Sequence, residues 1–497
     1  MTSQSIVSRL AYPRQAQFPF VHFRGQYRKQ PGYANLHTLY LEPQALPRFV
    51  RESPLAMRYL HLLGPIDWAV FPERDLETTW QITATPYAPF VAACLVKLDQ
   101  QLLYMSNLRR FLVSYPTLTW LLGFPLVLTP RHCFGFDVES SLPTQRHLTR
   151  MLRKIPNACL QFLLDETVRL LQAELAAETD DFGQCVSLDT KHILAWVKEN
   201  NHKAYVKDRY AKDKQPPGDL DCRLGCKRKH NQRTSSKEPL PTPADHALPA
   251  NTIPVAEFHW GYASGIVVTK VPGWGEFVLA ELTQPFDQPD VSYFHPLLAD
   301  VKRRLGFRPR FAALDAAFDA FYVYEYFHRM GQDWTKGFAA VPFVQRGGLT
   351  RAFDDQGLPL CDAGLAMPLK STFMARTVRF PHEKGCYVCP LLFPKATEQT
   401  CPIAHERWAK GGCTTKLATS IGARLRYQID RHSATYKRVY DQRTATERIN
   451  AQAVALGIER PRLRNGQAIA NLNTLIYALI NLRALQRVRL KKAERHL

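Results

Sequence analysis

The chain has 497 residues, of which 45% are hydrophobic and 22% are charged, as is usual for a folded protein. Its 65 Lys and Arg outnumber its 44 Asp and Glu and give a formal net charge of +21, which favours a polyanionic partner. No apolar run approaches the roughly 20 residues of a membrane-spanning helix, and residues 1–14 lack the apolar core of a signal peptide. Nucleic acid is therefore favoured over a membrane surface, and a cytoplasmic location is expected.

Residues 1–180 are expected to form a largely helical region that binds DNA. Apolar residues recur at three- and four-residue spacing in 90–103 and in 160–175, which predicts two helices. A third helix is predicted over 143–155, with Pro143 as its first residue. The basic face of this helix either enters a DNA groove or is the solvated side of a helix that packs in the protein, and the spacing of its basic and apolar residues fits both. Its basic residues are Arg146, His147, Arg150, Arg153 and Lys154.

A basic loop over 198–250 interrupts the next region, residues 181–344. Its segment 198–238 contains 12 Lys or Arg against 6 Asp or Glu, and several prolines follow. The loop is either a solvated linker or a surface that lies along a DNA backbone, with Arg228 and Lys229 among the contacts.

Strand and helix patterns alternate around this loop and predict the first part of an α/β core with a mixed sheet flanked by helices. Strands 265–271 and 276–282 flank the turn residues Pro272-Gly273-Trp274-Gly275, which predicts a hairpin. The other expected elements are a strand, a helix, a strand, a helix and a strand, at 184–188, 296–305, 310–314, 318–330 and 338–344.

Residues 345–430 break this alternation with clusters of Gly, Pro and Cys, and are expected to form an inserted subdomain. Apolar periodicity then predicts a long helix over 433–456 and a second helix over 471–492. Residues 431–497 would thus return the chain to the core and end it on a basic helix.

Three acidic residues stand out by their positions. Asp189 ends the first predicted strand, Asp315 ends the strand 310–314, and Glu447 lies on the long helix. If the two strands are neighbours, both Asp side chains project from the same rim, and a helix packed across that rim brings Glu447 to them. Three crowded carboxylates repel one another unless cations lie between them, so the arrangement predicts two Mg²⁺ or Mn²⁺ ions about 4 Å apart. Taken alone, an Asp at a strand end is more often a turn or helix cap.

The long helix adds a second signal, because Tyr440, Arg443 and Glu447 are spaced at i, i+3 and i+7. At about 100° per residue these three side chains share one helical face. Such a face offers one substrate an aromatic ring, a guanidinium for phosphate and a metal ligand.

Asp189, Asp315 and Tyr440-x2-Arg443-x3-Glu447 together resemble the DDE transposases of bacterial insertion sequences, in the branch marked by a Tyr-Arg-Glu signature. The likeness covers roughly residues 185–490. It implies an RNase H-like catalytic core in which Asp189, Asp315 and Glu447 match the metal-binding triad. Tyr440 and Arg443 match residues that contact the transposon end.

The resemblance also implies what the protein acts on. Its partners would be double-stranded DNA, namely the transposon's terminal inverted repeats and the target, with at least two protomers assembled on that DNA. The protein would cut at the transposon ends with divalent metal ions, join them to the target and associate with a bacterial nucleoid.

Two positions depart from a simple match. The family often has a basic residue seven positions after the glutamate, where this chain has Val454, although Arg448 and Arg460 are near. Asp319 is a rival to Asp315 as the second ligand, but it lies one helical turn beyond the strand, which favours Asp315.

The 11 cysteines are an odd number in a chain without an export signal, so reduced thiols or a metal site are expected rather than disulfides. A structural Zn²⁺ site is predicted at Cys386, Cys389, Cys401 and His405, with Cys413 as a substitute ligand. Thiols that only pack are the alternative. A weaker candidate is Cys222-x3-Cys226 with His230.

An active DDE transposase is therefore the function expected from the sequence. The alternatives are a non-catalytic, sequence-specific DNA-binding protein derived from a transposase, and a general RNase H-like nuclease. A protein that only binds DNA has no need of three converging acids, which favours an enzyme.

Overall fold

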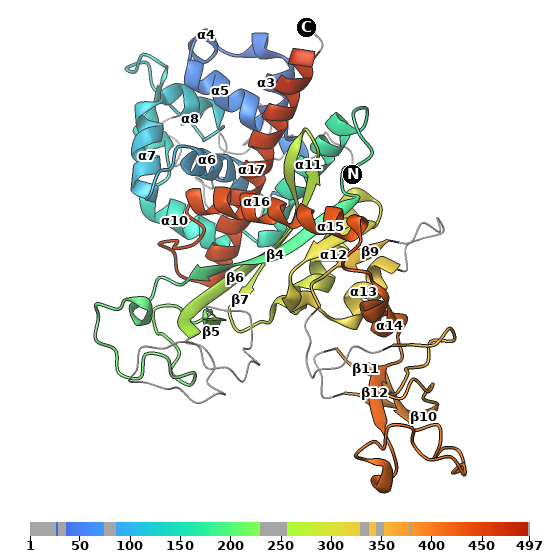
Figure 1. Ribbon diagram of the computed structural model, residues 1–497. Coiled ribbons are helices and arrows are strands. Elements are labelled where there is room, and N and C mark those ends of the chain that lie inside the picture. Colours follow the sequence, from blue (N-terminus) through green and yellow to red (C-terminus); the bar gives the residue numbers. More distant parts are fainter. Residues whose placement is uncertain are drawn as a thin grey trace, which may run out of the picture.

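The structure is a computed structural model that describes residues 26–27, 36–73, 86–228, 256–328, 337–343, 352–376 and 380–495. It is a mixed α/β protein in which helices flank a central mixed sheet. Helices of the N-terminal region gather at one end of the molecule, and a small antiparallel sheet lies at the other (Figure 1).

The central sheet has six strands, and β4 is the pivot of its topology. On one side β4 pairs antiparallel with β6, which in turn pairs antiparallel with β7 and, further along its length, with β5. On the other side β4 runs parallel to β8, and β8 runs parallel to β9. The strands are β4 (Cys185–Leu194), β5 (Arg223–Arg228), β6 (Ala256–Val271), β7 (Gly275–Pro285), β8 (Phe311–Leu314) and β9 (Phe338–Ala340).

Both faces of this sheet are apolar, because its residues alternate between two hydrophobic clusters. Ile266 and Val268 of β6 pack in one cluster together with Ile449, whereas Val267, between them, packs in the other with Leu297. Side chains alternate along a strand with a period of two, so a strand that is apolar throughout is covered on both faces. The structure thus places helices on each side of the sheet.

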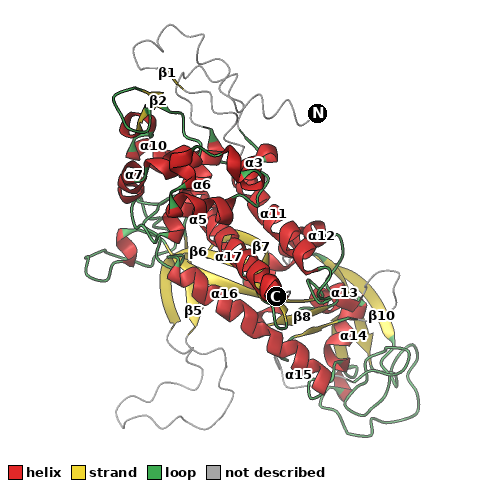
Figure 2. Ribbon diagram, turned by 90° about the horizontal axis from the view of Figure 1, so that it is seen from above, coloured by secondary structure: helices red, strands yellow, loops and turns green. Residues whose placement is uncertain are grey.

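Helices from distant parts of the chain cover the sheet. Helix α12 packs on β6 and β7, α16 packs on β4, β6 and β7, and α15 packs on β8 and β9. Helices α15 and α16 are joined by the 3-10 turn η9 and run end to end along the sheet (Figure 2). The helices around the sheet and those that follow it in the chain are α11 (Asn157–Leu175), α12 (Phe294–Leu305), α13 (Phe321–His328), α14 (Ile421–Gln428), α15 (Ala434–Tyr440), η9 (Asp441–Arg443), α16 (Thr444–Ala455) and α17 (Gly466–Arg495).

The N-terminal region is largely helical, as expected, and is not an independent body. Buried Asp99, at the end of α6, accepts hydrogen bonds from Tyr59 at 2.8 Å and from Arg483 of α17 at 2.7 Å, and pairs with Arg58 at 2.5 Å. The elements of this region are α3 (Leu36–Leu41), α4 (Arg48–Arg51), α5 (Pro54–Leu63), α6 (Tyr87–Asp99), α7 (Met105–Ser114), α8 (Pro116–Leu121), α9 (Val138–Ser141), α10 (Gln145–Lys154), and the paired strands β1 (Gln26–Tyr27), β2 (Val127–Leu128) and β3 (Phe136–Asp137).

Helix α17 holds the helical region against the sheet with buried polar side chains. Asn471 donates to the carbonyls of Leu152 and Ile155, both at 2.8 Å. Asn481 bonds both backbone groups of Val278 on β7, accepting at 2.9 Å and donating at 2.8 Å. Because buried amides are costly unless they are bonded, these pairs fix the position of the helix.

Helix α17 also corrects an expectation about apolar runs. By length and composition it could cross a membrane, since an 18-residue window has a mean hydropathy of 1.3, but 89% of that window is buried inside the protein. Its three asparagines and one threonine interrupt the run in the sequence, and all four of these side chains are buried in the core.

Most predicted elements are confirmed, with changes at their ends. The hairpin forms at the predicted turn, but β6 and β7 are longer than expected. The strand at 184–188 continues to Leu194, so Asp189 lies within β4 rather than at its end, because β6 pairs with β4 beyond the point where β8 stops. The predicted helix 433–456 is broken by η9 at 441–443.

The inserted region 345–430 contains a three-stranded antiparallel sheet, β10 (Leu369–Ala375), β11 (His382–Val388) and β12 (Thr414–Ala418). Helix α14 follows β12 and packs on α13, which brings the chain back towards the central sheet.

Candidate active site

Two of the three predicted acids lie side by side at one edge of the β4–β8 pairing. The last paired residues of these parallel strands are Leu188 and Leu314, and Asp189 and Asp315 follow them directly. Adjacent strands lie roughly 4.8 Å apart, and residues in the same register project to the same face. Asp189 is opposite Ile266, whose side chain packs with α16, so both carboxylates face the side that α16 covers.

A third acid, Asp290, joins them and was missed by the sequence reasoning. It begins the 3-10 turn η6 (Asp290–Tyr293), which contacts the turn η7 (Ala316–Phe318) that follows Asp315. Its carboxylate accepts a hydrogen bond from the hydroxyl of Thr190 at 2.7 Å. Because Asp290 does not end a strand, only its position beside β4 in the fold identifies it as a candidate site residue.

The electrostatics of this cluster are unfavourable for negative charge. The pKa of Asp189 is raised to about 6, chiefly by burial; the charges of Asp315 and Asp290 act in the same direction, while the backbone hydrogen bond from Thr190 and the charge of Arg443 oppose them. Burial is also the main reason why the pKa values of Asp315 and Asp290 are raised. Carboxylates held in this way favour a proton or a cation beside them.

Helix α16 contributes an amide to the same place. Asn450 donates to Asp189 at 3.2 Å, and its own Oδ1 atom is buried without a hydrogen-bond partner. A divalent cation takes oxygen ligands of these two kinds, carboxylate and amide carbonyl. Asp189 and Asn450 thus offer oxygen atoms of both kinds, and the buried amide oxygen lacks a partner among the described residues.

Glu447 is on the correct helix but is not gathered with the aspartates. It lies in the first turn of α16, is 53% exposed, and pairs with Arg443 at 2.5 Å. Arg443 also acts electrostatically on Asp189 and Asp315, so its guanidinium is the positive charge among the acids. In the parts of the chain that the structure describes, no group of three or more His, Cys, Asp or Glu side chains is placed to hold a metal ion.

The other signature residues have definite neighbours. Tyr440 stacks on Tyr436 with ring centres 5.9 Å apart, and Tyr436 stacks on Phe338 of β9 at 6.5 Å. Arg448 pairs with Glu276 of β7 at 2.8 Å, and Val454 is exposed on α16. The stack fixes Tyr440 at the end of α15, directly before the turn that presents Arg443.

Asp319, the rival to Asp315, has a structural role. Its carboxylate is nearly fully buried and accepts two hydrogen bonds from Arg426 of α14, at 2.7 and 2.5 Å, and one from Tyr324 at 2.8 Å. These bonds tie α13 to α14, so the preference for Asp315 over Asp319 as a candidate ligand is supported by the packing.

The described part of the basic loop is folded against the sheet. Arg209 donates to the carbonyls of Glu199 and Ala204, and its own carbonyl accepts from the indole of Trp260 at 2.9 Å. Arg228 is the last residue of β5, while Lys229 and His230 lie outside the described residues. The buried thiol of Cys222 donates to the carbonyl of Asp219 at 3.3 Å, whereas Cys226 is exposed.

The predicted zinc ligands are distributed differently from the expectation. Cys386 lies within β11, three residues before Cys389, and a spacing of three places these two side chains on opposite faces of an extended strand. Cys389 follows the last pair of β11 and β12, Val388 with Thr414, and so lies across from Cys413.

The Cys413 thiol is hydrogen-bonded to Cys389. Burial raises its pKa to about 12, and the neighbouring thiols of Cys389 and Cys361 act in the same direction. His405 lies 3.8 Å from Asp362, the residue after Cys361. Cys389 and Cys413, both predicted from the sequence as candidate ligands, are thus neighbours, and Cys361, which was not predicted, lies near enough to raise the pKa of Cys413.

No protein-family model matches the chain, and no curated protein matches it.

The acid cluster leads to a prediction about stability. Burial disfavours the charged form of Asp189, so the folded protein without metal is destabilised by that charge above a pH of about 6, and the penalty is relieved as the pH falls towards the ordinary value of 3.8. Asp189→Asn is expected to raise the melting temperature of the metal-free protein by roughly 2–4 °C near pH 7, and the gain should vanish near pH 4.

Calorimetric melting curves at the two pH values test this expectation, with Asp287→Asn, an exposed neighbour of Asp290, as the matched control. Added Mg²⁺ or Mn²⁺ should stabilise the wild type and not Asp189→Asn. A variant that melts below the wild type at both pH values would contradict the electrostatic explanation.

Proposed function

We propose that the protein is a DDE transposase that cuts DNA at transposon ends and joins them to target DNA. The observation that carries the proposal is the placement of Asp189 and Asp315 next to each other on parallel strands. Helix α16 brings Asn450 to them, and the preceding turn η9 brings Arg443, which pairs with Glu447. The strand order β7-β6-β4-β8-β9, with three antiparallel strands followed by two parallel ones, supports an RNase H-like core.

The acids would hold the metal ions. Asp189 and Asp315 share one register position, and Asn450 Oδ1 and Asp290 supply further oxygens beside them. Bound Mg²⁺ or Mn²⁺ would lower the pKa of an attacking water and stabilise the leaving oxygen of the phosphodiester. Loss of the proton from Asp189, whose pKa is about 6, is a precondition for binding, so cleavage should weaken below that pH.

Arg443 would change partners when DNA binds. In the free protein its guanidinium pairs with Glu447 and offsets the charges of Asp189 and Asp315. A DNA phosphate offers the same guanidinium a bidentate partner. Transfer of Arg443 to the phosphate would release Glu447, which could then turn towards the aspartates as the third metal ligand.

The rest of the molecule supplies surfaces for a polyanion. The basic side chains of α10 are largely exposed while Leu148, Met151 and Leu152 are buried, so that its charged face remains available. With a net charge of +21, attraction to the DNA backbone is expected to be strong and salt-dependent. Work on two transposon ends would require at least two protomers on the DNA.

The test uses DNA that carries the terminal inverted repeats that the proposal predicts on either side of the coding sequence. Purified protein and Mg²⁺ are expected to cut one strand at the end of the repeat and to join it to a plasmid target. A duplex with the repeat sequence scrambled is the control. Equal cutting of both duplexes would indicate a general nuclease, and specific binding without cutting would indicate the non-catalytic DNA-binding protein.

A structural zinc ion remains part of the proposal for the inserted region, with Cys389 and Cys413 as its first ligands. We expect protein purified without chelator to contain about one zinc ion, because adjacent thiols suit a tetrahedral zinc site. Elemental analysis of the double variant Cys389→Ser, Cys413→Ser should show its loss, while Cys133→Ser, an exposed cysteine elsewhere, should retain it. Zinc-free wild-type protein would leave these residues as packed thiols.

A further inference from the structure

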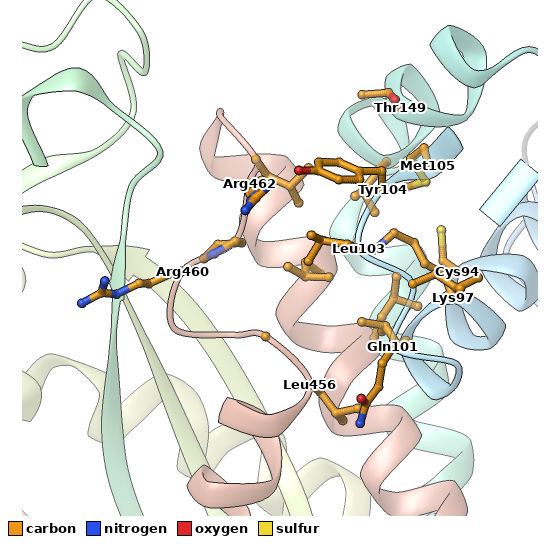
Figure 3. A pocket seen from close by; sticks show the side chains of 18 of the residues that line it. Cys94, Lys97, Gln101, Leu103, Tyr104, Met105, Thr149, Leu456, Arg460 and Arg462 are labelled. Carbon is orange, nitrogen blue, oxygen red and sulfur yellow. The ribbon is translucent and has the colours of Figure 1, made fainter. Parts of the chain in front are cut away.

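A pocket of about 440 Å³ lies between the N-terminal helices and the connection from α16 to α17. Its wall is largely apolar, with Leu98, Leu102, Leu152 and Leu475 among the residues that line it. Figure 3 shows Cys94 and Lys97 of α6 on one side of the pocket and Tyr104 with Arg462 on the other. A pocket of this size that combines an apolar wall with several polar groups is typical of a ligand site.

The charges that line this pocket are all positive. Lys97, Arg460 and Arg462 are in its wall, and no carboxylate is among its lining residues in the described chain. Lys97 is half-buried, and among the described residues its ammonium has no hydrogen-bond or ion-pair partner. Burial lowers its pKa, and only the thiol of Cys94 opposes that effect. An anion is the missing partner of such a cation.

The mouth of the pocket presents aromatic surface. The guanidinium of Arg462 lies 5.2 Å from the ring centre of Tyr104 and 5.5 Å from that of Trp196. Tyr104, which lines the pocket, is 43% exposed, and Trp196, which contacts Arg462 outside the pocket lining, is 49% exposed. Aromatic rings and arginine planes beside a basic groove are the means by which proteins bind the bases of single strands.

The pocket is linked to the candidate active site through one helix. Glu447 lies in the first turn of α16 and Asn450 near its middle, and Ala455, at its end, lines the pocket. Eight residues of α-helix span about 12 Å, which corresponds to roughly three or four nucleotide steps of 3.4 Å. A strand held at the acids therefore has the reach to enter the pocket.

We propose that this pocket binds one unstacked nucleotide of a DNA strand, with its base on the apolar wall beside Tyr104 and its flanking phosphates at Lys97 and Arg462. The inference rests on the proposed function for the identity of the polyanion as DNA. It goes beyond that function because it places a base-binding site outside the acid cluster.

Binding of a short single-stranded oligonucleotide containing 2-aminopurine tests the proposal, in EDTA so that no cutting is needed. Fluorescence anisotropy measures affinity, and the 2-aminopurine emission reports whether a base has left the stack. Tyr104→Leu is expected to lower affinity roughly 5- to 100-fold and to abolish the change in emission, whereas Tyr104→Phe should retain both. Lys97→Gln should reduce the slope of log affinity against log salt by about 0.7, as for one lost phosphate contact.

Arg131→Gln is the matched control, because it removes one exposed charge away from the pocket. It is expected to leave the emission change intact. A melting curve checks that Tyr104→Leu is folded. If this variant binds the oligonucleotide with wild-type affinity and gives the wild-type change in 2-aminopurine emission, the pocket proposal is overturned, even if the wild type cuts transposon ends. If the pocket variants alter binding but the wild-type protein does not cut DNA, the pocket proposal holds and only the transposase function is contradicted.

Discussion

Asp315→Asn is expected to lower metal-dependent cleavage of transposon-end DNA on the order of 10³-fold or more, about 4 kcal/mol of transition-state stabilisation, with DNA binding nearly unchanged. Asp315 directly follows the last paired residue of β8, opposite Asp189, and Asn keeps its shape while removing the charge that holds a cation. The Asp315 carboxylate also accepts a hydrogen bond from the backbone of Ala317 at 2.8 Å, which the Asn oxygen can retain, so the turn should remain folded.

The rate of strand cleavage and the affinity for the same DNA are measured together. Asp287→Asn serves as the control for a lost negative charge near the site, and should cut at the wild-type rate. A fall in DNA affinity that matches the fall in cleavage would mean that Asp315 acts in binding. Wild-type cleavage by Asp315→Asn would exclude it from the catalytic group.

The second large effect is expected on stability, from Asp99→Ala. This side chain is 2% exposed and joins three helices, because Arg58 and Tyr59 of α5 and Arg483 of α17 all contact its carboxylate. Removing one member of a buried ionic network leaves the others unpaired, and the free energy of unfolding should fall by about 3 kcal/mol or more.

Unfolding in urea measures that loss. Glu52→Ala, which removes the partner of Arg48 in an exposed pair, should change stability by less than about 1 kcal/mol. If the two variants were equally stable, the link between the N-terminal helices and α17 through Asp99 would not hold the protein together.

The sequence was sufficient to predict the elements that depend on local pattern. The hairpin at Pro272-Gly273-Trp274-Gly275, the helix at Asn157–Leu175 and the final helix all follow from periodicity and turn residues. The sequence predicts that Asp189 and Asp315 each end a strand. The structure brings them together, although Asp189 lies within β4, since the extension of that strand depends on pairing with β6.

The parts that escaped prediction depend on contacts between distant segments. Asp290 reaches Thr190 across 100 positions of the chain, and nothing in its local sequence marks it. The pairing of Cys389 with Cys413 follows from the register of β11 and β12 rather than from cysteine spacing. The 3-10 turn at Asp441–Arg443 breaks a pattern that fits a single helix, and it lies where Arg443 is presented to the acids.

The central claim is that Asp189 and Asp315 together hold a divalent cation. Anomalous X-ray diffraction from crystals grown with Mn²⁺ tests it most directly, because the signal locates the metal without reference to activity. The predicted result is a peak between the two carboxylates, roughly 2.1 Å from an oxygen of each, with the Oδ1 atom of Asn450 nearby. A map at saturating Mn²⁺ with no peak there, or with one whose ligands exclude both aspartates, would contradict the claim.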